Sequence, residues 1–445
     1  MSHYKPYPAY KDSGVEWLGL VPEHWDVCKL SFRYSIELGK MLDEKRLTKT
    51  SLVPYLRNQD VQWGSINTQD LPEMDIHPEE LERYTIRHGD LLVCEGGDVG
   101  RAAIWRGDNA AFGYQKALHR LRHRSVSADT AEFFYFSLLT AKQRGVFEES
   151  DSKATIAHLP AEKFRQYRFV FPPLPEQLCI AAQLDRETAR IDALIEKKTR
   201  LIELLREKRQ ALITHAVTKG LDPNVKMKDS GVEWLGEVPE HWDVLQLRHT
   251  ARLESGHTPS RSKPEYWIDC TVPWFTLADV WQVRSGEHKY VSETFEKVSQ
   301  LGLENSSARL LPAGSVFLSR TASVGYTGIM AVDMATSQDF AVWTCTTELF
   351  NEYLYYVLLG MKPDFVRLMM GSTHKTIYMP DIESIRIARP PVNEQRGIVS
   401  ALSGELDRFK GVIDKTERSI VLLKERRSAL ITAAVTGQID LREAV

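Results

Sequence analysis

Apolar residues recur at helical intervals in two long stretches of this chain. Between Pro175 and Thr218 there is no further proline and no glycine, and seven apolar residues follow one another at intervals of 7, 4, 7, 3, 7 and 4. The same intervals return between residues 402 and 434. Such spacing places apolar side chains along one edge of a helix and predicts a coiled-coil seam. The predicted seam consists of Leu184, Ile191, Ile195, Ile202, Leu205, Leu212 and Ala216 in the first helix and Leu402, Phe409, Ile413, Ile420, Leu423, Leu430 and Ala434 in the second.

The length of these helices favours a spacer. At about 1.5 Å per residue, a helix from residue 175 to 218 is about 66 Å long, whereas one turn of B-DNA is about 34 Å. Two such helices packed together would hold two other parts of the chain a fixed distance apart, and an antiparallel pair would relate them by a pseudo-twofold axis. The alternative is that each helix packs only on its own domain.

Two other blocks of sequence are duplicated. Residues 11–27 and 228–244 are identical at sixteen of seventeen positions and share the pattern GVEWLGxVPEHW. The run PPLPEQ that begins at Pro172 returns as PPVNEQ from Pro390, and the helix ends LREKRQALIT and LKERRSALIT match as well. The chain therefore reads as head, body and helix, twice over.

The two bodies, residues 28–171 and 245–389, are nearly equal in length but differ in sequence. Short apolar runs at 91–93 and 316–318 predict buried strands, and aromatic runs at 132–139 and 352–359 predict core helices, with base stacking as the alternative for their rings. Both bodies therefore read as α+β, with one fold and two different surfaces. Faint matches pair Pro54-Tyr55 with Pro273-Trp274, Asp60-Val61 with Asp279-Val280, Gly89 with Gly314, Val99-Gly100 with Val324-Gly325, and Thr155-Ile156 with Thr376-Ile377.

Polar loops at 94–101 and 319–326 follow the two predicted strands and differ in their polar residues. Carboxylates accept from cytosine amino groups, arginine reaches guanine or phosphate, and hydroxyl groups bond several base edges. The run PYLRNQDVQW adds further polar candidates, although an ordinary solvated turn is the alternative for each residue. The candidate DNA contacts are Arg57, Asn58, Gln59, Glu95, Asp98, Arg101, Gln115 and Lys116 in the first body and Arg320, Thr321, Ser323, Tyr326, Gln338 and Lys375 in the second.

Further comparisons between the bodies extend this set. Gln338 is matched with Gln115, and Lys375 with Lys153. From residue 110 to 128 there is no acidic residue, which predicts a phosphate-facing strip, although alternating basic residues also suit an exposed strand face. The basic residues of this strip are Lys116, Arg120, Arg122 and Arg124.

Composition limits what the chain can do alone. The net charge of −3 argues mildly against strong autonomous DNA binding, because phosphate neutralisation supplies much of that affinity, and leaves room for partners. The five cysteines are scattered and form no CxxC, which predicts no disulfide framework, no zinc site and a cytoplasmic location. No apolar run approaches the length of a membrane helix.

Catalytic motifs are missing from the sequence. There is no GxxxxGK[ST] loop and no GxGxxG turn, and the PDIE run at 380–383 lacks the Glu-x-Lys partner that a nuclease needs. No nucleophile or metal-ligand pattern accompanies His24 or His241, so we expect the heads to form a packed plug or a docking surface. The sequence predicts a protein that is not an enzyme and binds no metal or cofactor itself.

The duplicated heads, the PPLPEQ and PPVNEQ helix starts and the matching helix ends resemble the specificity subunits of Type I restriction–modification systems, over the whole chain. The resemblance implies two target-recognition domains that read an interrupted asymmetric DNA site through the major groove. It also implies an antiparallel coiled coil whose length sets the spacer. The expected boundaries are a first recognition domain at 1–171, a central helix at 172–220, a second recognition domain at 221–389 and a C-terminal helix and tail at 390–445.

The resemblance also implies partners. These are double-stranded DNA, two methyltransferase subunits that bind S-adenosylmethionine and modify adenine, and two motor–nuclease subunits, with ATP and magnesium likewise expected on the partners. The alternatives on the same architecture are a stand-alone bipartite DNA-binding regulator, which would bind DNA tightly without partners, and a scaffold that binds protein only. An enzyme fused into one chain is opposed by the missing motifs.

Overall fold

The structure is a computed structural model that describes residues 4–42, 49–107, 111–148, 158–286, 288–369 and 375–442. The chain forms two compact units, the first made of residues 1–198 and 418–445 and the second of residues 199–417. Each unit contains one head, one body and a part of both long helices. Because this division cuts through both helices, it does not test the boundaries predicted at residues 171, 220 and 389.

The body of the first unit is built on a four-stranded antiparallel sheet in the order β10–β9–β12–β4. A second sheet has the order β11–β5–β8, in which β11 is parallel to β5. The elements of this unit, apart from the long helices, are β1 (Tyr10–Asp12), β2 (Leu20–Pro22), β3 (Asp26–Lys29), α1 (Leu30–Arg33), β4 (Tyr34–Leu38), β5 (Leu52–Leu56), η2 (Asn58–Asp60), β6 (Val61–Gln62), β7 (Ser65–Ile66), β8 (Glu73–Asp75), η3 (Pro78–Glu80), α2 (Leu81–Tyr84), β9 (Leu91–Cys94), β10 (Ala102–Ile104), β11 (Gly113–Tyr114), β12 (Leu118–His123), α3 (Ala131–Gln143), α4 (Ala161–Gln166) and β13 (Arg168–Phe171).

The body of the second unit repeats this strand order and adds one strand, β19, which is parallel to β22. Its main sheet has the order β17–β24–β21–β22–β19, and its second sheet has the order β20–β18–β23, with β23 parallel to β18. The elements of this unit are β14 (Met227–Asp229), β15 (Glu237–Pro239), β16 (Asp243–Gln246), η4 (Leu247–His249), β17 (Ala251–Ser255), η5 (Pro264–Trp267), β18 (Val272–Phe275), η6 (Leu277–Gln282), β19 (Tyr290–Val291), β20 (Glu296–Val298), α6 (Gln300–Glu304), β21 (Val316–Ser319), β22 (Thr327–Met330), β23 (Ala335–Thr336), β24 (Phe340–Cys345), α7 (Asn351–Gly360), α8 (Lys362–Leu368), α9 (Met379–Glu383) and β25 (Arg386–Arg389).

Buried strands and aromatic helices form both cores, as the sequence predicts. All four residues of β9 and of β21 are buried. In the first body Phe134 of α3 packs with Leu91 and Leu121 of the sheet, and in the second Leu354 of α7 packs with Val316. The aromatic runs on α3 and α7 therefore belong to the cores, and base stacking by their buried rings is excluded in this conformation.

The glycines shared by the two bodies have the same backbone conformation. Gly89 and Gly314 have φ values of 84° and 86°, and Gly100 and Gly325 have φ values of 83° and 86°. Residues other than glycine rarely adopt such positive φ angles, so these positions require glycine in both copies. The conformations confirm the faint sequence matches at these positions.

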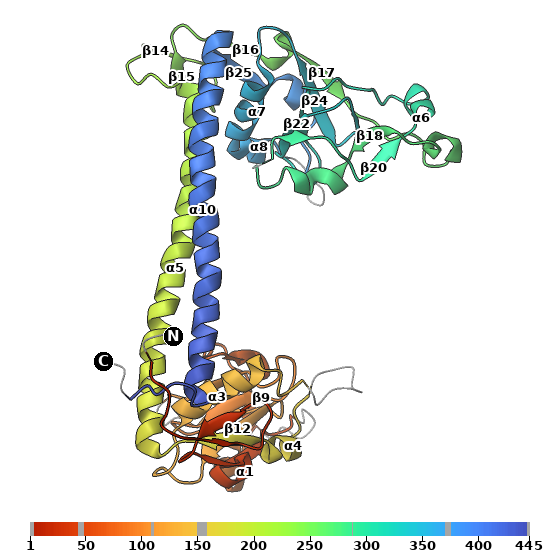
Figure 1. The fold of residues 1–445 in the computed structure, drawn as a ribbon. Coiled ribbons are helices and arrows are strands. Elements are labelled where there is room, and N and C mark those ends of the chain that lie inside the picture. Colours follow the sequence, from red (N-terminus) through yellow and green to blue (C-terminus); the bar gives the residue numbers. More distant parts are fainter. Residues whose placement is uncertain are drawn as a thin grey trace. The chain divides into compact units, whose positions relative to one another are not determined.

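Helix α5 (Leu174–Lys219) and helix α10 (Val392–Val435) pack against each other within each unit (Figure 1). In the second unit Arg206 pairs with Glu417 at 3.0 Å, and Lys208 lies 5.8 Å from the ring centre of Phe409. The number of the partner residue falls as the residue number rises, so the two helices are antiparallel there. The predicted coiled coil is confirmed in each unit.

The seam also contains polar residues that the apolar pattern omits. Every predicted seam residue is buried or half-buried. Thr188 and Thr416 are buried as well, and Arg209 and Arg427 fill the middle of two intervals of seven. An apolar pattern alone skips these positions because their side chains are polar. When these polar residues are included, steps of three and four residues replace the intervals of seven residues in the predicted seam.

Each head contacts the start of a long helix, and the two heads make the same contacts. The indole of Trp25 donates to Glu176 at 3.1 Å, and the indole of Trp242 donates to Glu394 at 3.0 Å. His24 lies 2.9 Å from the second carboxylate oxygen of Glu176, as His241 does from Glu394. These contacts confirm that the heads are packed structural elements.

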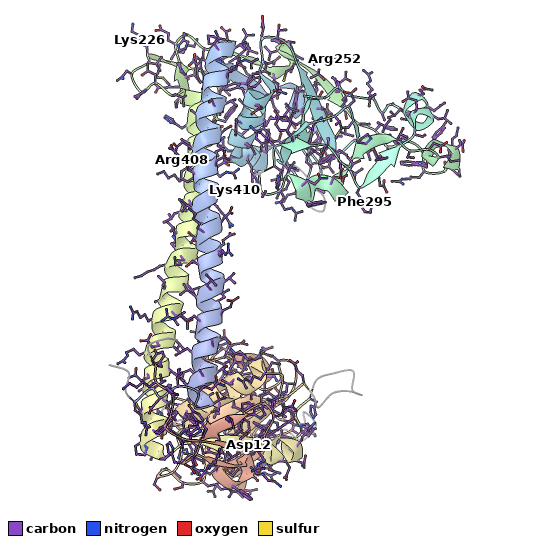
Figure 2. All side chains as sticks on the ribbon, in the orientation of Figure 1. Asp12, Lys226, Arg252, Phe295, Arg408 and Lys410 are labelled. Carbon is purple, nitrogen blue, oxygen red and sulfur yellow. The ribbon has the colours of Figure 1, made fainter. Side chains whose placement is uncertain are left out.

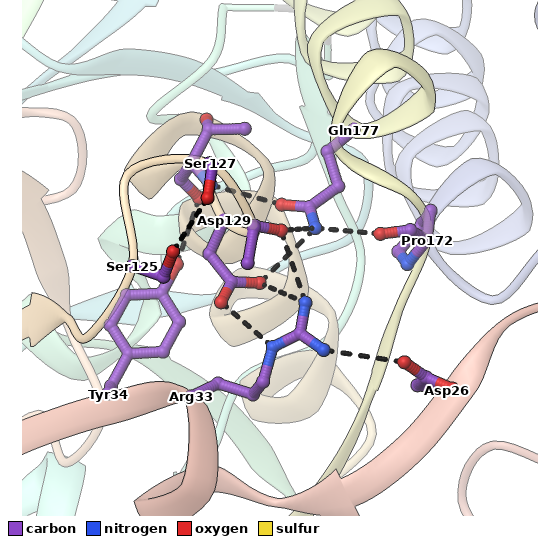
Figure 3. A network of polar contacts seen from close by, with 10 residues as sticks. Asp26, Arg33, Tyr34, Ser125, Ser127, Asp129, Pro172 and Gln177 are labelled. Atoms are coloured by element: carbon purple, nitrogen blue, oxygen red, sulfur yellow. Dashed lines mark hydrogen bonds and ion pairs between the residues drawn. The ribbon is translucent and has the colours of Figure 1, made fainter.

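The glutamine after each of these glutamates joins the helix to its body. Gln177 is fully buried and donates to the Pro172 carbonyl at 2.8 Å and to the Ala128 carbonyl at 2.9 Å, while its own carbonyl accepts from the Thr130 amide at 3.1 Å (Figure 3). Gln395 makes the matching contacts with Pro390, Glu348 and Phe350 in the second unit. The PPxxEQ motif is therefore duplicated because each copy joins the start of a long helix to its body by the same contacts.

An ion pair stabilises this joint in the first unit. Arg33 binds both carboxylate oxygens of Asp129 at 2.8 Å, and one of those oxygens also accepts from Gln177 at 3.2 Å (Figure 3). The bond to Asp129 raises the pKa of Arg33. Asp129 is buried, so this pair holds the start of α3 and the start of α5 in a common network.

Candidate nucleic-acid interface

Five segments of the first body meet around Asn58, and we call them the first recognition cluster: residues 39–40, 57–60, 94–101, 115–117 and 158–159. The Asn58 side-chain amide donates to the Gly96 carbonyl at 3.0 Å and to the Ala117 carbonyl at 3.4 Å. Arg101 donates to both the carbonyl and the side-chain oxygen of Asn58, at 3.0 and 2.9 Å. The structure thus brings together loops that the sequence analysis selected separately.

Asn58 and Arg101 hold the cluster together more than they face solvent. These bonds use both ends of the Asn58 amide, and the side chains of Asn58 and Arg101 are only half-exposed. The Arg101 Nε is buried and has no partner among the described residues. We therefore assign Asn58 and Arg101 a positioning role within the cluster, beside the DNA contact predicted for them.

The turn at 57–60 presents its side chains from a fixed base. Asp60 is buried and accepts from Arg57 Nε at 2.8 Å, from Arg57 Nη2 at 2.9 Å and from the Arg57 amide at 2.8 Å. These bonds to Arg57 outweigh the opposing effect of burial and lower the pKa of Asp60. Gln59, between the two, is exposed. With its amide turned so that oxygen faces donors, Gln59 accepts from Arg57 Nη2 at 3.2 Å and from Nη1 at 3.3 Å, so the turn offers a fixed guanidinium and the exposed amide nitrogen of Gln59.

Two acidic residues of the 94–101 loop differ in exposure. Glu95 is buried and lies 3.2 Å from His158, and burial raises the pKa of Glu95. Asp98 is more exposed and pairs with Lys142 at 3.4 Å. His158 is more exposed than Glu95, so the pair presents an imidazole at the surface with a carboxylate behind it.

The remaining side chains of the first cluster face outward. Lys116 is exposed and Gln115 is half-buried, in the turn between β11 and β12. At the end of β4, a Cβ on Gly39 would lie 2.3 Å from the Gln115 carbonyl oxygen, so only glycine permits this approach. Lys40 follows it and pairs with Glu80.

The second body builds the same framework, the second recognition cluster, from residues 256–257, 276–279, 319–326, 337–339 and 376–377. The Glu95 amide donates to the Ala117 carbonyl in the first cluster, and the Arg320 amide donates to the Asp339 carbonyl in the second, at 3.0 and 2.8 Å. A Cβ on Gly256 would lie 2.1 Å from the Thr336 carbonyl oxygen, which repeats the close approach of Gly39.

Matching backbone bonds correct two of the predicted correspondences. The Gln115 amide donates to Leu56, and the Ser337 amide donates to Phe275 at the equivalent strand end. Gln115 therefore corresponds to Ser337, and Gln338 corresponds to Lys116; the predicted match of Gln338 with Gln115 is wrong by one residue. Matching the two bodies by residue spacing alone does not reveal a difference of one residue, because the pairing of the strands sets which residues are equivalent.

The match of Thr376-Ile377 is shifted too. The Leu159 amide donates to the Glu95 carbonyl, as the Ile377 amide does to the Arg320 carbonyl. Thr376-Ile377 therefore corresponds to residues 158–159. Lys153 and Thr155-Ile156 lie outside the described residues.

The candidate residues of the second body lie in or beside its cluster. Arg320 donates to the Ile377 carbonyl at 3.4 Å, and Thr321 bridges to Thr376. The exposed Gln338 accepts from the Thr258 hydroxyl at 2.7 Å. The amide of Ala322 donates to the carbonyl of Lys375, whose side chain is exposed.

Two candidates complete the loop at 319–326. Ser323 is half-buried, and its amide donates to the Thr321 carbonyl at 2.6 Å. The ring of Tyr326 carries Lys362 at 4.7 Å and Arg284 at 5.9 Å from its centre. The structure brings all the candidate residues of each body together, while their contact with DNA stays a prediction.

Equivalent positions of the two clusters carry different side chains on one framework. A bidentate guanidinium, an amide, an ammonium and a hydroxyl group select different base edges or phosphates. The equivalent pairs are Lys40 and His257, Arg57 and Thr276, Glu95 and Arg320, Asp98 and Ser323, Arg101 and Tyr326, Gln115 and Ser337, Lys116 and Gln338, and His158 and Thr376.

The phosphate-facing strip predicted between residues 110 and 128 is wrong for two of its members. Arg120 is buried and donates to the carbonyls of Glu82, Arg83 and Thr85, each at 3.0 Å. Arg122 binds both oxygens of Asp90, at 2.7 and 2.6 Å. Both side chains hold the body together, because backbone carbonyls of residues 82–85 cover Arg120 and a buried carboxylate binds Arg122.

Sequence reasoning missed several residues near the clusters. The glycine before Lys40 and before His257 was a usable signal, since ELGK and ESGH occupy the same place in the two bodies. Trp281 and Phe295 are 70% and 82% exposed. Trp281 lies in η6 together with Asp279, and the Phe295 amide donates to the Asp279 carboxylate. Figure 2 shows Phe295 at the edge of the second body, beside β20. No periodic pattern marks exposed aromatics in loops.

Two other features are absent from the described parts of the chain. There, no three His, Cys, Asp or Glu side chains come close enough to hold a metal ion. No helix in those parts has the length and apolar character needed to cross a bilayer.

Comparison with known proteins supports the fold and the family. Residues 22–204 and 239–416 match the family described as Type I restriction modification DNA specificity domain. A putative type I restriction enzyme MjaX specificity subunit from Methanocaldococcus jannaschii is 22% identical over 434 residues, which cover 96% of each chain.

Two solved structures share the fold. The first comes from work on complex assembly and conformational transition of the type I R-M system, with a TM-score of 0.74, 17% identity and coverage of 94% of this chain and 99% of that one. The second is the crystal structure of the HsdS subunit from Thermoanaerobacter tengcongensis, with a TM-score of 0.60, 17% identity and coverage of 94% and 98%.

Proposed function

Because this chain belongs to the Type I restriction–modification DNA specificity family, we propose that each of its two recognition clusters reads one part of an interrupted, asymmetric DNA sequence. The chain is the DNA specificity subunit of such a system and a non-catalytic part of the restriction–modification complex. The observation that carries the proposal is the pair of clusters with matching backbone bonds and different side chains.

The first cluster offers groups that suit direct readout of a half-site. Arg57 is held in a fixed orientation by Asp60 and Gln59, and its remaining N–H donor suits guanine, while the exposed amide nitrogen of Gln59 suits the N7 acceptor of adenine. Lys116 suits a phosphate, because an exposed ammonium is a strong but undirected donor.

The second cluster offers another chemistry on the same framework. Thr276 replaces the arginine and Gln338 replaces the lysine, while Arg320 stands where the first cluster has Glu95. The imidazole of His158, which covers the buried Glu95, is replaced by the hydroxyl group of Thr376, and the two groups favour different bases. The two half-sites are therefore expected to differ in sequence.

A chain with two copies of one body tests this assignment. Residues 28–171 are replaced by a second copy of residues 245–389, and methylated adenines are mapped by sequencing in a strain carrying the complete system. The expected result is a methylated site in which the second half-site occurs twice as an inverted repeat. Loss of the second half-site as well, with the chain folded and assembled, would contradict the modular proposal.

We propose that the coiled coil sets the separation of the half-sites. Helices α5 and α10 run without interruption for 46 and 44 residues. Each helix contacts one head at its start and the other head at its end. Deleting one heptad from each helix, at 195–201 and 413–419, shortens each by about 10 Å. The preferred half-site separation should then fall by about 3 base pairs. An unchanged separation would contradict the proposal that the coiled coil sets the distance between the half-sites.

The chain is part of a Type I restriction–modification assembly. We infer that two methyltransferase subunits and two motor–nuclease subunits join it, and that they bind the S-adenosylmethionine, ATP and magnesium. The slightly acidic chain supports this arrangement, because partners would then share the phosphate contacts. All five cysteines are free thiols, which suits a reducing cytoplasm.

A further inference from the structure

A cavity of about 530 Å³ lies inside the second unit, between its body and the two long helices. Its walls come from α5, from α10, from α7 and from residues 284–286 and 289. That volume is in the range of small-ligand pockets, which is about 300–1,000 Å³. The cavity is separate from the second recognition cluster, although Arg284 of its wall lies 5.9 Å from the ring centre of Tyr326 in that cluster.

The wall of this cavity is strongly basic. Five of the lining residues are basic and two, Asp407 and Glu417, are acidic. Glu417 is paired with Arg206 at 3.0 Å. The basic residues are Arg206, Arg209, Arg284, Lys289 and Lys410.

Arg209 is aimed by the backbone of the opposite wall. It donates to the Ser285 carbonyl at 3.3 Å and to the Gly286 carbonyl at 2.5 Å, which uses two of the five guanidinium N–H donors. Burial and the nearby charge of Arg209 lower the pKa of Lys362, which packs on the same side of the body. The charge of Arg209 therefore contributes a positive potential at the position of Lys362.

The equivalent cavity in the first unit is small and neutralised. It measures about 170 Å³ and contains two basic and two acidic lining residues. Arg427, the counterpart of Arg209, pairs with Asp192 at 2.9 Å, and Arg106 pairs with Glu132 at 3.5 Å. Lys289 pairs with Glu352, the counterpart of Glu132, in the second unit as well. The two cavities therefore differ in the balance of their lining residues, which are two basic and two acidic in the first unit and five basic and two acidic in the second.

One substitution accounts for much of this contrast. Counting from the PPLPEQ and PPVNEQ starts, Lys410 occupies the position of Asp192. Figure 2 shows Lys410 and Arg408 on opposite sides of α10, and Lys410 is the one that lines the cavity. The position that holds an acidic partner of Arg427 in the first unit therefore holds a basic side chain in the second.

We propose that this cavity binds the oxyanions of a phosphate group. Arginine guanidinium groups match phosphate geometry with paired N–H donors, and clustered cations of one sign are stabilised by an anion between them. The phosphate comes either from the backbone of DNA held by the second recognition cluster or from a small free phosphate compound. The first source rests on the proposed function, and the second does not.

The test uses the full-length chain and pyrophosphate as the probe. Pyrophosphate binding is measured by isothermal titration calorimetry at constant ionic strength for the wild type, Lys410→Asp, Arg284→Ala and Lys415→Asp. Lys415→Asp is the matched control, because this exposed residue of α10 does not line the cavity. Lys410→Asp restores the residue type of the first unit, so it should fold; thermal unfolding checks this.

The expected result is binding to the wild type and to Lys415→Asp, with at least a tenfold loss in Lys410→Asp and Arg284→Ala. The salt dependence of DNA binding by the assembled complex then identifies the source. A slope of log Kd against log salt that is lower by about 1 in Lys410→Asp assigns the phosphate to DNA, and an unchanged slope assigns it to a free phosphate compound.

Two outcomes would overturn the proposal. One is the absence of pyrophosphate binding to the wild type, and the other is an equal loss in Lys415→Asp and Lys410→Asp. Neither outcome affects the assignment of half-sites to the two clusters, because that assignment is read from the sequence around methylated adenines.

Discussion

The indole N–H of Trp25 donates to the carboxylate of Glu176 at 3.1 Å, although 151 residues separate them in the chain. Trp242 and Glu394 repeat the bond at 3.0 Å across 152 residues. Each bond ties a head to the third residue of a long helix. The duplicated head and the duplicated helix start are therefore the two sides of one contact.

Replacing these glutamates should destabilise the two units to different extents. The Glu176 side chain is 5% exposed and that of Glu394 is 33% exposed. Glu176→Ala leaves the buried Trp25 donor without a partner, which costs about 2–3 kcal/mol, and Glu394→Ala should cost less. Urea unfolding of the full chain measures both. An equal loss in the two variants would show that burial of the carboxylate does not set the strength of this bond.

The glycine at the edge of each recognition cluster should not tolerate a side chain. A Cβ would lie 2.3 Å from a backbone oxygen at Gly39 and 2.1 Å at Gly256. Gly39→Ala should displace the turn at 115–117 and weaken recognition of the first half-site only, and Gly256→Ala should do so for the second only. Adenine methylation of sites with one altered half measures this. Relaxation of the opposite half-site would contradict the assignment.

Reciprocal exchange of Lys116 and Gln338 tests the corrected correspondence of the clusters. Both side chains are exposed at equivalent turn positions. Lys116→Gln should lower the slope of log Kd for DNA against log salt by about 1, and Gln338→Lys should raise it by about 1. The double exchange should restore the wild-type slope. Filter binding of the assembled complex over a series of salt concentrations measures the slope.

A buried histidine should make the first unit sensitive to acid. His119 is fully buried, and burial lowers its pKa to about 4. A histidine in the unfolded chain has a pKa near 6.5. Between these values the unfolded chain binds a proton that the folded chain does not, so stability falls as the pH drops from about 6.5 towards 4, by about 3 kcal/mol.

His119→Ala is the control for this pH dependence, because Ala341 occupies the equivalent strand position in the second unit. The variant should unfold more easily at neutral pH, since it loses packing, but its stability should vary less between pH 6.5 and 4. Unfolding free energies at a series of pH values provide the measurement. A variant with the wild-type slope would assign the acid sensitivity to other groups.

Three glycines weaken helix α10. A Cβ on Gly397, Gly404 or Gly411 would meet nothing within 4 Å. Glycine within a helix costs about 0.5–1 kcal/mol relative to alanine, so Gly404→Ala should stabilise the protein by about that amount. Gly437→Ala is the opposite case, because its Cβ would lie 2.2 Å from Pro22 and its φ is 72°. Thermal unfolding should show a rise for the first variant and a fall for the second.

The sequence alone determined the duplicated plan and the seam of the long helices. Both are local properties: identical blocks are visible by direct comparison, and a heptad pattern follows from the period of a single helix. The strands at 91–94 and 316–319, the turn glycines and the core role of the aromatic helices followed from local patterns as well.

The tertiary structure decided which polar residues are free. Asn58 is engaged by Gly96, Ala117 and Arg101, and Arg120 is buried under three carbonyls, yet nothing near either residue in the sequence shows this. The basic cavity around Arg209 also joins segments far apart in the chain. Such contacts arise from strand register and helix packing, which a polar residue's own neighbours in the sequence do not encode.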